Sequence, residues 1–143
     1  MTPSPKRVDE GAIRLCEDSA QIEKMQFAVA HALASFSYPD AAMFAIRLSI
    51  EEAVMNGFRH GNLSDPQKMV EVRWHIDAQS AVLHVIDEGD GFNPEAVPDP
   101  TLDENLEIPS GRGLMLIRAY MSHAKYHGPG NHLEMHFLRE AKS

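Results

Sequence analysis

Apolar and polar residues alternate over residues 12–17, and this period of two predicts a half-buried β-strand. Helical spacing follows: apolar residues recur three or four positions apart from Ser19, an expected N-cap, to about residue 36. Tyr38-Pro39-Asp40 interrupts this pattern, and a second helix is predicted over residues 40–60, ended by Gly61-Asn62. The first half of the chain therefore predicts one strand and two helices.

Strand patterns dominate the second half. Period-two alternation over residues 69–77 and 81–87, separated by Ala78-Gln79-Ser80, is typical of a β-hairpin. Residues 93–110 contain four prolines and five acidic residues without Lys or Arg, and we expect a mobile loop there. A helix over 113–123 and two closing strands, 124–128 and 132–139, complete the prediction.

This order of elements lacks regular β-α-β alternation. It predicts an α+β two-layer sandwich, in which helices cover one face of a mixed, mostly antiparallel sheet. With 143 residues and 43% hydrophobic composition, the chain is long enough for one core and too short for two ordinary domains. We expect a flexible N-terminal tail over residues 1–11 and a single domain over residues 12–143.

The charge balance narrows the class of partner. The chain has 13 basic and 21 acidic residues, a net charge of −8, which argues against direct nucleic-acid binding and favours protein or small-molecule partners. Cys16 is the single cysteine, so an internal disulfide and a thiolate zinc site are excluded. The N-terminus has no apolar segment typical of a signal peptide, and no run is long enough to span a bilayer. We expect a cytoplasmic protein.

Candidate chemistry begins in the second predicted helix. Glu52, Asn56 and His60 are four residues apart and lie in one row on a helix surface. Phe44 and Leu48 continue this row upstream, so it is apolar for two turns and then polar for two. Such a row indicates a helix whose second half lines a polar pocket, although the three polar residues alone are better explained as ordinary helix surface.

Two glycine clusters follow. The segment Asp87-Glu88-Gly89-Asp90-Gly91 places a carboxylate where a strand stops and glycines where the backbone can approach a ligand closely. The segment Ser110-Gly111-Arg112-Gly113-Leu114 opens a helix, whose N-terminal N–H groups and positive dipole end suit a phosphate. Taken separately, the first is better explained as a turn and the second as a hinge with a helix cap.

The fixed order of the three segments resembles the GHKL superfamily of ATP-binding proteins, which includes gyrase, MutL and the histidine kinases and has the Bergerat ATP-binding fold. Residues 52–62 resemble its N box, Asp87 to Gly91 its first glycine box and Gly111 to Leu114 its second. Within that superfamily, the His60-Gly61 pair after the N box is similar to the anti-sigma-factor serine/threonine kinases of bacterial partner-switching systems. We expect no separate phosphoacceptor helix of the histidine-kinase type.

The resemblance implies roles for the first two boxes. Asn56 is implied to bind Mg²⁺ through its side-chain oxygen, and Glu52 to act as the general base for the attacking hydroxyl. Asp87 is implied to accept a hydrogen bond from the adenine amino group. His60 either lies near the phosphates or is a helix C-terminal histidine favoured by the helix dipole.

For the glycines, the resemblance implies close approach to ATP. Gly89 and Gly91 are implied to let the chain pass near the base and sugar. Gly111, Arg112, Gly113 and Leu114 are implied to wrap the triphosphate, with Arg112 either contacting phosphate directly or remaining solvated.

As a whole, the resemblance implies an ATP- and Mg²⁺-binding anti-sigma factor that phosphorylates an anti-sigma antagonist of the STAS type and sequesters a sigma factor, in a subfamily whose members commonly form homodimers. The alternative is a nucleotide-dependent protein-binding switch of the same fold with little or no kinase activity. One segment departs from the family pattern, because Gly130-Asn131-His132 stands where many relatives carry a Gly-Thr pair that helps hold adenine.

Eight histidines raise the question of a metal site. His123 and His127 are four apart, as are His132 and His136, which on strands separates the side chains by roughly 13 Å. That distance is too long for shared coordination, so we expect ordinary surface or core histidines.

Overall fold

The computed structural model describes residues 8–89, 109–127 and 131–139. In chain order the elements are β1 (Asp9–Leu15), α1 (Ser19–Ser35), α2 (Asp40–Asn56), the π-helix η1 (Gly57–Gly61), β2 (Val70–Ile76), β3 (Ser80–Asp87), α3 (Pro109–Tyr120), β4 (His123–His127) and β5 (His132–Leu138). Strand β1 begins at Asp9, so residues 9–11 belong to the sheet and not to the predicted tail. No helix in the described part of the chain is long and apolar enough to cross a bilayer.

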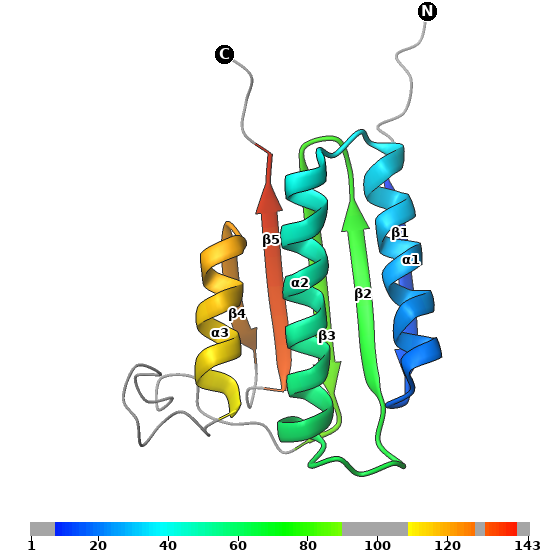
Figure 1. Cartoon of the computed structure of the whole chain (residues 1–143), viewed down its shortest axis with the longest axis vertical. Coiled ribbons are helices and arrows are strands. Elements are labelled where there is room, and N and C mark those ends of the chain that lie inside the picture. The colour runs from blue at the N-terminus through cyan, green and yellow to red at the C-terminus, as the bar shows by residue number, and fades with distance from the viewer. Residues whose placement is uncertain (1–7, 90–108, 128–130, 140–143) are drawn as a thin grey trace, which may run out of the picture.

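The five strands form one sheet in the order β1-β2-β3-β5-β4, and every neighbouring pair is antiparallel. Helices α1, α2 and α3 lie side by side on one face of this sheet (Figure 1). The predicted α+β two-layer sandwich is confirmed, with an antiparallel sheet in place of a mixed one.

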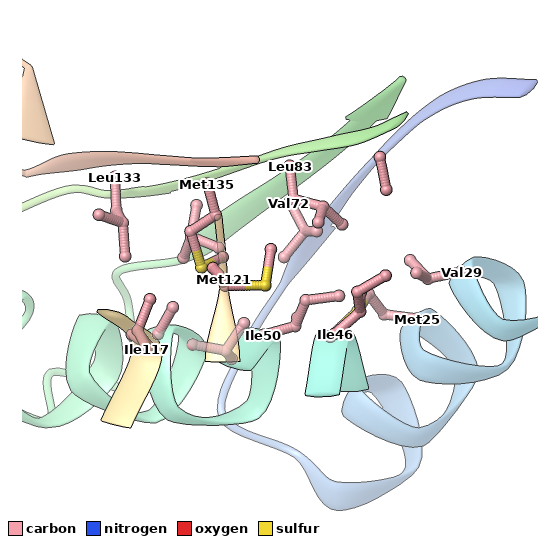
Figure 2. Close-up of a cluster of buried hydrophobic side chains, with 14 of the residues drawn as sticks. Met25, Val29, Ile46, Ile50, Val72, Leu83, Ile117, Met121, Leu133 and Met135 are labelled. Carbon is pink, nitrogen blue, oxygen red and sulfur yellow. The ribbon is translucent and has the colours of Figure 1, made fainter. Parts of the chain in front are cut away.

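The core lies between the two layers. Figure 2 shows strand side chains such as Leu83 and Met135 pointing toward helix side chains such as Ile50 and Ile117, and all four are fully buried. On each strand, alternate residues face the helices, as the period of two predicts, while the other face of the sheet carries mostly polar side chains together with Val82 and Ile86 of β3. The apolar spacing of α1 and α2 is the stripe that this core requires.

Local chemistry sets the helix boundaries, and three predictions of them were wrong. The N-cap of α1 is Asp18, whose side chain accepts the N–H of Ala20 at 3.0 Å, and not Ser19. Helix α3 begins at Pro109, four residues before its predicted start. Proline suits the first position of a helix, because the backbone N–H that it lacks would have no acceptor within the helix. It ends at Tyr120, and His123 begins β4.

Helix α2 continues directly into η1, where the Asn62 N–H donates to the Gly57 carbonyl oxygen at 2.7 Å. The helical prediction over residues 40–60 is thus confirmed in extent, but its last turn is π-helical. Glu52 and Asn56 lie on α2 in one row, as predicted, whereas His60 lies in the wider turn, where the four-residue spacing no longer holds. Single π-turns are frequent at functional sites.

Candidate functional site

Three chain segments meet at one end of the molecule. Figure 1 shows the C-terminal ends of α2 and β3 and the N-terminal end of α3 at this same end. Helix α3 packs against both α2 and η1, and η1 packs against β3. The structure therefore brings together the elements that carry the three sequence motifs.

Asp87, the last residue of β3, lies against the backbone of η1. A Cβ added at Gly61 would be only 2.3 Å from the Asp87 Cγ, and one added at Gly89 would be 1.9 Å from the Gly61 carbonyl oxygen. Both distances are shorter than any real Cβ contact, so only glycine is compatible with this packing. The backbone that approaches Gly89 is that of Gly61. The predicted approach of Gly89 to the base and sugar of ATP stays a prediction.

Burial of the Asp87 side chain raises the pKa of its carboxyl group, while the hydrogen bond from the Gly89 N–H and the charge of Lys68 lower it. The Gly89 N–H donates to Oδ1 at 2.8 Å. A carboxylate has about four acceptor positions, so one backbone donor leaves capacity for a ligand donor. Asp87 is suited to accept a hydrogen bond from a bound molecule.

Asn56 ends α2 with an unsatisfied polar group. Its side-chain amide nitrogen is buried and has no hydrogen-bond partner among the residues that the structure describes. Buried amides are almost always paired, and an amide group can exchange its oxygen and nitrogen by a simple flip. The amide oxygen is a ligand type that Mg²⁺ prefers, so Asn56 fits the predicted magnesium ligand.

The other two residues of the N box differ in environment. Glu52 lies one turn before Asn56 on α2 and is half-buried. His60 is exposed on η1, and desolvation of its ring together with the charge of Arg59 lowers its pKa. Both interpretations of His60, near the phosphates or at a helix C-terminus, stay predictions.

Asn62 is a site residue that sequence reasoning missed, because the pattern indicated only a helix end there. Its side chain is fully buried. Its Oδ1 accepts the Glu88 N–H at 2.8 Å, and its Nδ2 donates to the Met69 carbonyl oxygen at 3.1 Å. No local signal in the sequence could reveal this link, since Glu88 is 26 positions away.

Asn131, which immediately precedes β5, also contacts the end of β3. Its carbonyl oxygen accepts the Asp87 N–H at 2.9 Å. Its side-chain Nδ2 donates to the carbonyl oxygens of Asp87 and Gly89, at 3.3 and 3.4 Å. The residue that departs from the family pattern is therefore bonded to the main chain of the first glycine box.

The remaining predicted site residues are Gly91 and the four residues of the second glycine box. Gly91 lies outside the described residues. Gly111, Arg112, Gly113 and Leu114 form the first turns of α3, so the second glycine box is helical and does not precede the helix. The predicted contact of Arg112 with phosphate stays a prediction.

The histidines of β3, β4 and β5 gather on the open face of the sheet, and the strand-spacing estimate missed their cross-strand neighbours. Strands β4 and β5 pair His123 with His136 and His127 with His132, with ring centroids 5.7 and 4.9 Å apart. Within the described ranges, no group of three or more His, Cys, Asp or Glu side chains is arranged to hold a metal ion.

Two comparisons bear on this arrangement. The family model described as histidine kinase-like ATPase domain matches residues 16–137, which spans every element from α1 to the end of β5 apart from its last residue. No curated protein matches the chain.

Proposed function

The chain belongs to the histidine kinase-like ATPase domain family, and from this premise we propose that it is an anti-sigma factor with serine/threonine kinase activity. ATP binding follows from family membership. The proposal adds a substrate, an anti-sigma antagonist of the STAS type, and a binding partner, a sigma factor. The nucleotide site rests on the likeness of the N box and both glycine boxes to those of the superfamily, and the choice of kinase rests on the His60-Gly61 pair, which is similar to that of the partner-switching kinases.

The observation that best supports a working nucleotide site is the environment of Asp87. Its carboxyl group is half-buried, has one backbone donor and lies against Gly61 and Gly89. In the proposed complex, a free acceptor position of this carboxylate takes a hydrogen from the adenine amino group. Guanine carries a carbonyl at the equivalent position, which would face the carboxylate unfavourably.

Asn56 would hold Mg²⁺ through its side-chain oxygen. When bound, the ion offsets the negative charge of the phosphates and stabilises charge that develops during transfer. The N–H groups of Ser110 and Gly111 in the first turn of α3 have no intrahelical acceptor and are available to phosphate oxygens.

Glu52 would orient the attacking hydroxyl and accept its proton. In the proposed reaction, a serine or threonine oxygen of the antagonist attacks the γ-phosphorus of ATP. The bond from that phosphorus to the β,γ-bridging oxygen breaks, ADP leaves and the hydroxyl proton passes to the Glu52 carboxylate. A base in this position contributes a factor of about 10² to 10⁴ in rate.

Calorimetric titration with ATP, with and without Mg²⁺, tests nucleotide binding. We expect Mg²⁺-dependent binding that is at least about tenfold weaker in Asp87→Asn, because a hydrogen bond to a charged group is lost. The absence of binding by the wild-type chain at millimolar ATP would overturn the proposed function.

Phosphate transfer is then measured with labelled ATP and purified STAS proteins from the same genome. We expect Glu52→Gln to lose at least about 100-fold in transfer rate with unchanged ATP affinity. Glu51→Gln is the matched control, because Glu51 is the neighbouring residue on α2 but is exposed. If the wild-type chain binds ATP and transfers nothing to any antagonist, the chain is a nucleotide-dependent binding switch and not a kinase.

A further inference from the structure

Two asparagines, Asn62 and Asn131, form hydrogen bonds with the main chain at the end of β3, next to the candidate adenine acceptor Asp87. Asn62 follows η1, and Asn131 precedes β5, so they reach the strand end from different elements. We propose that both are positioning residues, which fix the carboxyl group of Asp87 and thereby set the preference of the site for purines with an amino group. This inference rests on the proposed function and names the part of the chain that makes the site selective.

Asn62 connects three segments in a buried place. Besides the bonds from its side chain to Glu88 and Met69, its backbone N–H donates to Gly57 in η1. The Met69 N–H also donates to the Glu88 carboxylate, so the start of β2 and the end of β3 are joined on this side. Because the Asn62 side chain is 0% exposed, its truncation would remove both bonds and leave the partly buried Glu88 N–H and Met69 C=O without their partner.

Asn131 completes the hold from the other neighbouring strand. Its carbonyl takes the Asp87 N–H, and its amide reaches the carbonyls of Asp87 and Gly89. Three successive main-chain groups, the N–H and C=O of Asp87 and the N–H of Glu88, are therefore bonded to one asparagine or the other.

The side chain of Asp87 has little freedom once its main chain is fixed. The Gly61 backbone is in contact on one side, and the Gly89 N–H holds Oδ1. Loosening the main chain would let the carboxyl group turn away from a ligand donor. Such a change weakens recognition of a purine amino group and leaves phosphate binding unaffected, whereas general damage to the fold weakens both.

The test compares ATP with purine riboside triphosphate, which has the same sugar and phosphates but no amino group. The ratio of the two dissociation constants, measured by calorimetry with Mg²⁺, reports amino-group recognition alone. We expect Asn131→Ala to weaken ATP binding about fivefold, the value of one neutral hydrogen bond, and to leave the analogue unchanged. Asn62→Ser should reduce the ratio at least as much, with a larger loss of thermal stability.

Two controls separate positioning from stability. Tyr38→Phe removes a buried hydrogen bond to Asp77, just beyond the opposite end of β2, and should leave the ratio unchanged. In an Asp87→Ala background, Asn131→Ala should have no further effect on the ratio, because the carboxyl group that it positions is absent.

Equal weakening of both nucleotides by Asn131→Ala, or an unchanged ratio, would overturn the inference while the proposed function stands. Failure of the wild-type chain to bind either nucleotide would overturn the proposed function and this inference together.

Discussion

Replacing Gly61 by alanine tests the geometry of the site most directly. The new Cβ would lie 2.3 Å from both Cγ and Oδ2 of Asp87 and 2.5 Å from its Oδ1. Either the carboxyl group must turn or the end of η1 must move away from β3. The main chain at Asp87 is bonded directly to Asn131 and, through the next residue Glu88, to Asn62, so we expect the carboxyl group to turn.

The size of the effect follows from two costs. Overpacking by one methyl group lowers the free energy of unfolding by about 1–3 kcal/mol, and a chain of this length loses about 3 °C in Tm per kcal/mol. Misplacing a charged hydrogen-bond acceptor costs a further about 1.5–3 kcal/mol in binding, which weakens ATP affinity about 13- to 150-fold.

Gly57→Ala is the matched control in the same π-turn. Its Cβ would meet Val70 Cγ2 at 3.1 Å and Asp87 Cβ at 3.5 Å, and its φ of −59° is helical. The small displacement of Val70 is offset by the helix preference of alanine over glycine, about 1 kcal/mol. We expect wild-type Tm and ATP affinity in thermal unfolding and calorimetry. Wild-type ATP affinity in Gly61→Ala would refute the assignment of Asp87 as the adenine acceptor.

Two further predictions concern stability. Tyr38→Phe removes the 2.8 Å hydrogen bond from the buried hydroxyl to the Asp77 carbonyl and should lower the free energy of urea unfolding by about 1–2 kcal/mol without changing ATP affinity; an unchanged unfolding curve would contradict it. Burial lowers the pKa of His84 and His132 in the folded state, so the unfolded chain takes up protons first as the pH falls. Stability should therefore be complete above about pH 6.5 and decline below it, and His84→Gln should reduce that decline in urea titrations at pH 7.5 and 5.0.

The sequence predicted α1 and α2 well because their apolar stripes are continuous and free of glycine. It placed α3 too late along the chain because the two glycines at 111 and 113 lower local helix propensity. Tertiary packing decides the outcome: Ile117 and Met121 are buried against the sheet and α2, and this packing supports a helix that local preference would not.

Spacing along one strand could not reveal the histidine neighbours, because the side chains that meet come from different strands. The pairs His123 with His136 and His127 with His132 depend on the register of β4 and β5, which the connecting turn sets. Two residues four apart on a strand are distant, yet each has a partner directly opposite. Sequence spacing gives the distance between two residues along one strand, but it does not give the distance between residues on neighbouring strands.

The candidate site likewise contains two kinds of residue: those that a sequence motif reveals and those that only contacts in the folded chain reveal. Asp87, Gly89 and Asn56 stand out in the sequence because they fall in segments that resemble the boxes of a known family. The side chain of Asn62 is instead hydrogen-bonded to Glu88 and Met69, and those contacts form only when η1 packs against the end of β3. Residues that position a ligand-binding group are thus constrained by tertiary geometry, so their substitution should alter selectivity between nucleotides before it abolishes binding.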